Sequence, residues 1–486
     1  MILPRIVAGV GIAVLSIAVC KFALHLWASL PDGYFGDELY YLACSQHLAW
    51  GYVDQPPLIA WLTWGSRELL GDSLPAIRLL PAVAGALEVL LADRISKELG
   101  GGGMARILTA LAVLVAPGFL AMNSFLSMNS FEPVFWLGCA IVVIRLVNGA
   151  PLRTWLWFGL LAGLGLENKH SMLIFGFAVL AGLTLTPERR LMRTRWFLAA
   201  GLLAGIVFLP NLLWNVEHGF PFLELQENIR RSGRNVSLTP LSFLSEVALA
   251  MNPVSAPLWL AGLWYLFSGR PRFRLLGWAF VITAALLVTL NPRIYYLFPA
   301  FPILFAAGGV AWERLAAAAS QRWIFPAYAT LLLVGGALAA PLGMPLLPVE
   351  TFLRYSAWLG IGQPAVETRK LGPLPQPFAD RFGWKEMAET VAGVFHSLPR
   401  EIQPRTAIFA QNFGQAGAID LFGPALDLPK AISGHQSYLK RLFYSVERVA
   451  SVSHRYSMPD QHVDVFYCQG SQKPLREYWP SVKKWQ

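Results

Sequence analysis

Charged residues are scarce in this chain, and their scarcity excludes a soluble globular protein. Asp, Glu, Lys and Arg make up 14% of the 486 residues, whereas hydrophobic residues make up 55%. Soluble domains carry about a quarter of their residues as charges, so we expect this chain in a membrane. Its 18 Trp and 14 Tyr agree with that expectation, because aromatic side chains gather at both membrane–water interfaces.

Common functional signatures are missing as well. The Gly100–Gly103 run is not followed by the Gly-Lys-Ser/Thr of a phosphate-binding loop, and no residues have the spacing of a zinc-ligand pair. The net charge of +10 comes from short basic clusters between apolar runs, so we predict no nucleic-acid partner. Only four cysteines occur. Cys44 and Cys468 fall on the same predicted side of the membrane, which leaves both a disulfide and two free thiols open.

Long apolar runs dominate what remains. A spanning helix needs about 20 apolar residues, and some of the runs are shorter than this. The runs lie near 5–28, 75–92, 104–121, 133–147, 154–167, 170–186, 196–214, 253–268, 275–290, 295–311 and 323–341. They predict an all-α polytopic membrane protein with about eleven transmembrane helices.

Basic residues set the predicted orientation. Arg and Lys concentrate in alternate connections, within 94–106, 145–153, 189–195, 270–274 and 314–322. Cytoplasmic connections carry this excess, so we expect a cytoplasmic amino terminus. The arginines 230, 231 and 234 are an exception on the opposite side. The membrane domain is then 1–341, including a long external loop at 29–74.

Residues 342–486 contain no further spanning run and are predicted to form a small external domain. Helical patterns near 384–397 and 415–422, with strand patterns near 406–410 and 463–467, indicate an α/β unit. In the 29–74 loop, Leu39, Leu42, Ala43, Leu48 and Ala49 suggest a short amphipathic helix on the membrane surface.

That loop also carries three acids close to the bilayer: Asp37, Glu38 and Asp54. Carboxylates near a membrane are costly and usually functional, although a merely solvated loop is the plainer interpretation. Carboxylates can deprotonate a hydroxyl nucleophile or bind a divalent cation through oxygen. Asp37 is the preferred catalytic acid.

Further polar residues lie at the external ends of the predicted helices. They are Arg78, Glu132, Lys169, His170, Arg293, Tyr295 and Tyr296. Lys and Arg can neutralise a phosphate, and the tyrosines can donate hydrogen bonds to its oxygens. Each has a plainer alternative. Glu132 suits the first turn of a helix, Lys169 can extend to the interface, and the tyrosines can belong to an aromatic belt.

Several segments in order resemble the GT-C glycosyltransferases of family 39, in particular their large bacterial branch. Asp37 to Tyr40 is similar to the Asp-Glu motif of the first external loop in that family. The other similar segments are Gly51 to Leu58, Arg78 to Leu80, Asn129 to Pro133, Leu166 to His170, Leu209 to Gly219, Gln411 to Gly423 and Ile432 to His435. The resemblance covers essentially the whole chain and implies the GT-C fold.

The resemblance also implies an activity, namely transfer of a sugar from a polyprenyl-phosphate carrier to an acceptor on the external face. Asp37 would be the base or orient the acceptor, with Glu38 as its partner. Asp54 and Glu132 would be further carboxylates and candidate ligands of a divalent cation, and Lys169 would face the donor phosphate. Gln55 departs from the family, because the aminoarabinose-transferase branch has a phosphate-binding Lys there.

We therefore predict a multi-pass glycosyltransferase of a bacterial inner membrane, with membrane lipids around it and a periplasmic carboxy-terminal domain. The acceptor class, whether lipid, glycan or protein, stays open. The main alternative is a secondary transporter or lipid flippase, although the sequence lacks the two related halves typical of transporters. A non-catalytic scaffold would leave the external acids without a role.

Overall fold

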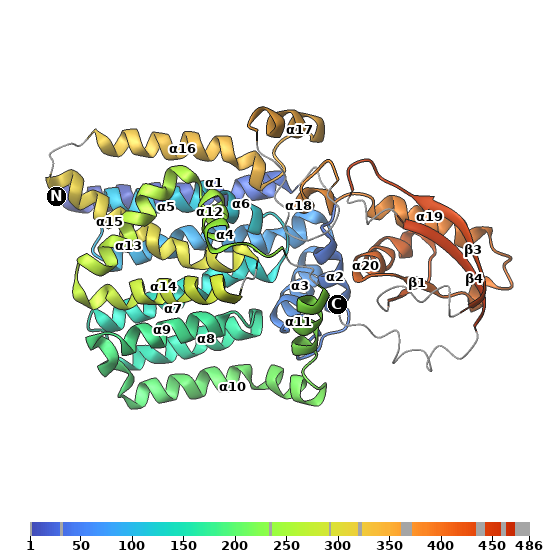
Figure 1. The fold of residues 1–486 in the computed structure, drawn as a ribbon, viewed down its shortest axis with the longest axis horizontal. Helices are drawn as coiled ribbons and strands as arrows, with labels where there is room; N and C mark the ends of the chain where they lie inside the picture. The colour runs from blue at the N-terminus through green and yellow to red at the C-terminus, as the bar shows by residue number, and fades with distance from the viewer. Residues whose placement is uncertain are drawn as a thin grey trace.

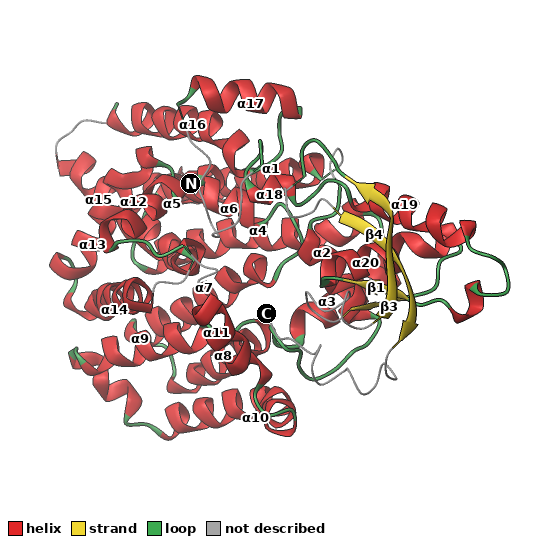
Figure 2. Ribbon diagram, turned by 45° about the vertical axis from the view of Figure 1, so that its right-hand side comes forward, coloured by secondary structure: helices red, strands yellow, loops and turns green. Residues whose placement is uncertain are grey.

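A computed structural model describes residues 2–29, 33–232, 236–290, 293–318, 323–360, 372–433, 443–457 and 463–471. Arg234, Arg322, Gly434 and His435, which the sequence patterns included, lie outside these ranges. Helices dominate the described chain, and the few strands gather in one region near its carboxyl end (Figures 1 and 2).

A helix occupies each of the eleven predicted spans. The helices are α1 (Ile2–Ala28), α4 (Leu74–Glu98), α5 (Gly103–Val115), α7 (Met128–Val147), α8 (Trp155–Asn168), α9 (Met172–Thr184), α10 (Arg195–Glu217), α13 (Ala256–Ser268), α14 (Arg274–Leu290), α15 (Phe301–Ala318) and α16 (Ile324–Gly343). They lie side by side in one helical body (Figure 1). The helical, multi-pass architecture that the sequence predicted is confirmed.

Fewer helices count as membrane spans when each must be long enough to cross the bilayer. Seven described helices are long and apolar enough to cross a membrane, or eight if the bent pair of α12 (Pro240–Ala250) and α13 is one span. The runs predicted at 104–121, 154–167 and 170–186 became helices of 13, 14 and 13 residues. The first of them ends at Val115 and is followed by Ala116, whose backbone is extended, because a following proline disfavours the helical conformation. The chain resumes as α6 (Pro117–Met122).

Small residues bring some helices very close together. A Cβ built on Gly308 of α15 would lie 1.9 Å from the Leu258 carbonyl oxygen of α13, and one on Gly262 would lie 2.0 Å from that of Leu304. Only glycine permits this approach, which is a common way to pack helices in membranes. In contrast, α10 lies at the edge of the body and packs mainly against α8 (Figure 1).

The long connection predicted at 29–74 contains two helices, α2 (Gly36–Ser45) and α3 (Leu58–Leu70). The predicted short helix is therefore present, but the prediction that its apolar side chains lie on the membrane surface was wrong. Leu39 and Leu42 are fully buried in protein contacts. Leu39 packs with Trp384 and Ile419 of the carboxy-terminal region, and Leu42 packs with Ile59 and Ile77.

The carboxy-terminal region is a small α/β unit, as predicted. It has the helices α17 (Val349–Trp358), α18 (Gln376–Ala379), α19 (Trp384–Ser397) and α20 (Phe413–Phe422). Strand β1 (Ile408–Ala410) pairs in parallel with β2 (Ala431–Ser433), and β3 (Phe443–Val452) pairs antiparallel with β4 (Val463–Ser471). The sequence indicated β1, β4, α19 and α20, but not β2 or β3. The unit packs onto α2 through α20.

Candidate active site

Helix α2 presents the first two acids. Asp37 and Glu38 occupy its first turn, where the positive end of the helix dipole favours negative charge. The Glu38 carboxylate turns back and accepts from the Phe35 N–H at 2.9 Å. Asp37 is half-buried and lies one turn before Tyr41, on the same face of the helix.

Glu38 is completely buried and holds several segments together. Its carboxylate accepts from Arg78 Nε at 2.9 Å, from Arg78 Nη2 at 2.7 Å and from the Leu126 N–H at 2.8 Å, in addition to the Phe35 N–H. Burial alone would raise the pKa of Glu38, but the Arg78 charge and these hydrogen bonds outweigh it and lower the pKa. Glu38 therefore stays ionised, and its oxygens are occupied.

The third acid, Asp54, lies opposite α2. Its carboxylate accepts from the Tyr40 hydroxyl at 2.7 Å. Burial raises the pKa of Asp54, although the Tyr40 hydrogen bond partly opposes this. The neighbouring Gln55 is buried and donates a long contact to Cys44 Sγ at 3.9 Å. All four cysteines are free thiols, so Cys44 and Cys468 form no disulfide.

Lys169 forms a second cluster where α7 begins and α8 ends. Its ammonium donates to Glu132 Oε2 at 2.8 Å and to Asn129 Oδ1 at 2.8 Å. The second Glu132 oxygen accepts from the Ser171 hydroxyl. Asn129 and Glu132 are three residues apart on α7, so they share one face. The sequence pattern did not assign roles to Asn129 and Ser171.

Two tyrosines cover the ammonium. Tyr295 and Tyr296 belong to the 3-10 helix η5 (Ile294–Ala300) and stack at 5.1 Å between ring centroids. Lys169 Nζ lies 3.8 Å from the centroid of Tyr296 and 5.2 Å from that of Tyr295, within cation–π range. Arg293 directly precedes this helix and acts electrostatically on Tyr296.

Tyr41 connects the acidic cluster with the lysine cluster. Burial raises the pKa of Tyr41 well above its ordinary value, and Asp37, Asp54, Cys44 and Tyr295 raise it further. These groups therefore all lie within electrostatic reach of one hydroxyl. Tyr41 also belongs to an apolar cluster against which Met128 and Phe131 pack, and these residues flank Asn129. Nothing in the sequence spacing indicated that Tyr41 has this position.

His170 belongs to a different contact. Its Nε2 lies 3.3 Å from Asn211 Oδ1 on α10, and the Asn211 amide donates to the Trp50 carbonyl at 2.8 Å. His170 thus helps to join the segment after α8 to α10 and to the connection between α2 and α3, and it is not part of the Lys169 cluster. A further buried group that the sequence analysis missed is the ion pair of Lys21 on α1 with Glu88 on α4 at 2.9 Å.

The predicted divalent cation finds little support in the geometry. The two Glu132 oxygens accept from Lys169 and Ser171, and Asp54 accepts from Tyr40. Within the described ranges, no three His, Cys, Asp or Glu side chains gather as a metal-binding group. The carboxylates present therefore do not fit a site in which protein carboxylates alone bind the cation. The divalent cation stays a prediction.

Comparison with known proteins places these residues in a family context. The family model described as dolichyl-phosphate-mannose-protein mannosyltransferase matches residues 54–214. This range contains Asp54, Glu132 and Lys169 but begins after Asp37. A lipid A galacturonosyltransferase, RgtD, of Rhizobium johnstonii is 28% identical over 187 residues, which are 38% of this chain and 39% of that protein. The chain thus matches about two fifths of the length of this curated relative.

Solved structures show the same architecture over nearly the whole chain. ArnT from Cupriavidus metallidurans bound to undecaprenyl phosphate superposes with a TM-score of 0.59 and 16% identity, covering 91% of this chain and 96% of that one. Its apo form gives a TM-score of 0.56 and 14% identity, covering 88% and 86%. These similarities, with the family model, confirm the predicted resemblance and show the GT-C fold.

Proposed function

We propose that this chain is an integral-membrane glycosyltransferase that moves a sugar from a polyprenyl-phosphate carrier to an envelope acceptor. The observation that carries the proposal is the meeting of two opposite clusters at Tyr41. The acids Asp37 and Asp54 act on its hydroxyl together with Tyr295, which covers the Lys169 ammonium. Transfer from a phosphate-linked donor requires a base for the acceptor hydroxyl and a cation for the leaving phosphate.

The chemistry assigns each cluster a separate task. Asp37 accepts the proton of the acceptor hydroxyl as its oxygen attacks the anomeric carbon of the donor sugar. The bond between that carbon and the phosphate oxygen breaks, and the polyprenyl phosphate leaves with the bonding electrons. Lys169 stabilises the charge that develops on the phosphate, with Arg293 and the tyrosine hydroxyls as further donors. Attack opposite the leaving group inverts the configuration.

Glu38 and Arg78 take a positioning role in this proposal, although the sequence suggested a catalytic and a substrate-binding role. Glu38 is 0% and Arg78 2% exposed, and the Glu38 carboxylate has four donors. A carboxylate so occupied is a poor proton acceptor. The pair instead fixes the first turn of α2 against α4 and thereby orients Asp37.

The comparisons support the donor class and favour a transferase over a transporter or flippase. The ArnT structure contains undecaprenyl phosphate, and RgtD is a galacturonosyltransferase of lipid A. We extend a polyprenyl-phosphate donor to this chain by proposal and leave the acceptor class open. The proposal includes the orientation that the basic connections predict, with a cytoplasmic amino terminus and an external carboxy-terminal unit in a bacterial inner membrane.

Deletion of the protein followed by mass spectrometry of envelope lipids and glycans tests the function. We expect one component to lose a single sugar and to regain it when the wild-type chain is restored. An unchanged envelope, combined with flux of a lipid or solute in reconstituted vesicles, would instead favour the transporter. Cysteine accessibility at exposed Glu386 and exposed Arg270, after substitution by Cys, tests the orientation, because only the first site should react from outside.

A further inference from the structure

A polar cavity of about 410 Å³ lies beside α2, at the end opposite Asp37. Its lining comes from the end of α2, from α3 and from the turn that follows α3. The lining residues are Ser45, Gln46, Trp64, Arg67, Glu68 and Asp72. The volume is within the range of small-ligand sites, which is about 300–1,000 Å³. Neither the family resemblance nor the proposed transfer step uses any of these residues.

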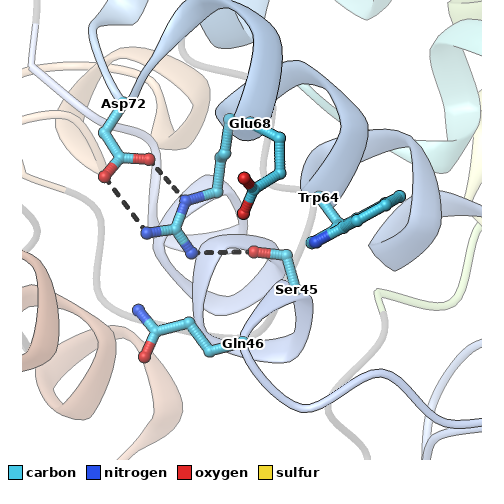
Figure 3. Close-up of a pocket in the computed structure, with 6 residues that line it drawn as sticks. Ser45, Gln46, Trp64, Glu68 and Asp72 are labelled. Carbon is cyan, nitrogen blue, oxygen red and sulfur yellow. Dashed lines mark hydrogen bonds and ion pairs between the residues drawn. The ribbon is translucent and has the colours of Figure 1, made fainter.

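One side of the cavity is a network of hydrogen bonds and ion pairs (Figure 3). Arg67 pairs with Asp72 through Nε and through Nη2, the latter at 3.1 Å. Its Nη1 donates to the Ser45 hydroxyl at 2.9 Å and to the Leu42 carbonyl at 3.0 Å. Arg67 thus donates to Asp72, Ser45 and Leu42 and forms part of the cavity wall.

The remaining walls offer groups that are open to a ligand. Trp64 is 43% exposed, and Glu68 makes no hydrogen bond or ion pair with any part of the chain that the structure describes. The Glu68 carboxylate and the Trp64 indole nitrogen both point into the cavity (Figure 3). Gln46 completes the rim and accepts from Lys430 of the carboxy-terminal unit at 3.1 Å.

We propose that this cavity binds a saccharide unit of the acceptor. A sugar ring has hydroxyls that both donate and accept hydrogen bonds. Glu68 supplies strong acceptors, and Gln46 and the Trp64 N–H supply donors. Glu68 also favours an ammonium group, so an amino sugar binds more tightly than its neutral counterpart.

The location explains how such a subsite serves transfer, and this step depends on the proposed function. Ser45 and Asp37 are eight residues apart on one helix, which is roughly 12 Å at 1.5 Å per residue. A sugar bound in the cavity is therefore a short distance from the proposed base. A neighbouring unit of the same glycan can reach Asp37, so the cavity would select acceptors that contain more than one sugar.

Saturation-transfer NMR on the full-length protein, purified in a detergent without a sugar headgroup, tests the proposal. The probes are D-glucosamine and D-glucose. We expect both to bind the wild-type protein, glucosamine more tightly. Glu68→Gln should weaken glucosamine roughly tenfold, as expected for one charged hydrogen bond, and glucose less. Trp64→Ala should weaken both roughly tenfold.

The controls are Glu386→Gln and Trp358→Ala, which alter an exposed acid and an exposed tryptophan elsewhere. They should leave both affinities unchanged. Two results would overturn the proposal. In the first, the wild-type protein binds neither sugar. In the second, the Glu68→Gln and Trp64→Ala variants keep the wild-type melting temperature and bind both sugars as tightly as the wild-type protein does. A Trp64 that serves only as an interfacial aromatic would give that second result. Binding of undecaprenyl phosphate, which tests the proposed function separately, should not change in either variant.

Discussion

Gly417 of α20 lies against the backbone of Leu39 on α2. A Cβ built on Gly417 would be 2.6 Å from the Leu39 carbonyl oxygen and 3.0 Å from the Leu39 Cβ. Leu39 follows Asp37 and Glu38 in the chain, and its side chain is part of the core of the carboxy-terminal unit. The carboxy-terminal unit therefore contacts the helix that carries the proposed base.

Substitution Gly417→Ala should impair transfer without affecting donor binding. The added methyl group meets backbone rather than a flexible side chain, so α20 and α2 must separate and Asp37 must move. A displacement of about 1 Å can cost on the order of a hundredfold in rate. We expect kcat to fall by at least tenfold while the affinity for undecaprenyl phosphate stays unchanged.

The matched control is Gly393→Ala on α19, because a Cβ there meets nothing within 4 Å. This variant should transfer sugar at the wild-type rate. Wild-type kcat in Gly417→Ala would show that the contact does not orient α2. Weakened donor binding in that variant would indicate a wider distortion.

Lys169 is expected to determine binding of the donor phosphate. Lys169→Met removes the ammonium but leaves Glu132 buried without its partner, so the double variant Lys169→Met with Glu132→Gln is the cleaner test. A hydrogen bond to a charged group contributes about 1.5–3 kcal/mol. We therefore expect the affinity for undecaprenyl phosphate to fall roughly 10- to 100-fold in a calorimetric titration.

Lys385→Met is the control for this loss of charge. Lys385 is exposed on α19 and lies 3.7 Å from Glu389, and its removal should leave donor binding unchanged. If the double variant binds undecaprenyl phosphate as tightly as the wild-type protein does, Lys169 has a structural role only.

The Glu38–Arg78 pair should give stability a defined dependence on pH. The pKa of Glu38 is below its ordinary value of 4.5 in the folded protein. Its stabilising contribution is therefore complete above about pH 4.5 and is lost as the pH falls through the lowered pKa. Thermal melting of wild-type protein in detergent should decline in that acidic window, and Glu38→Gln should lack this part of the decline.

At neutral pH, Glu38→Gln leaves the buried Arg78 charge uncompensated and should cost about 3–5 kcal/mol of unfolding free energy. Asp72→Asn breaks the ion pair with Arg67, in which the Asp72 side chain is 44% and the Arg67 side chain 19% exposed. This substitution should cost at most about 1 kcal/mol of unfolding free energy. Equal costs in the two variants would contradict the role given to burial.

The buried Lys21–Glu88 pair allows another stability test. Both side chains are 0% exposed, and Asn123 also donates to Glu88 at 3.1 Å. Lys21→Met alone should destabilise by about 3–5 kcal/mol, whereas Lys21→Met with Glu88→Gln should recover most of the loss. The measurement is the melting temperature of the three proteins in one detergent. No recovery in the double variant would show that the pair does more than balance charge.

Hydropathy predicted the helical body well, because long apolar runs are local signals. The arginines between the runs predict which side of the membrane Asp37, Glu132 and Lys169 face, and this orientation stays a prediction. The short helices α5, α8 and α9 show the limit, since an apolar run does not reveal where a proline or a turn ends the helix.

The sequence did not predict which charged side chains pair between distant segments. Glu38 joins Arg78, and Lys21 joins Glu88, across 40 and 67 residues, and no local periodicity encodes such partners. Leu39 was assigned to the membrane surface because its apolar neighbours fit an amphipathic helix. The surface that covers it, α20, follows in the chain only after all the spanning helices.

Sugar transfer by Asp37→Asn provides the most direct test of the proposed function. The variant keeps the shape of the side chain but removes the proton acceptor. With a polyprenyl-phosphate sugar donor and an envelope-extract acceptor, we expect transfer to fall by at least a hundredfold, with wild-type donor binding and melting temperature. Full transfer by this folded variant would contradict the assignment of Asp37 as the base.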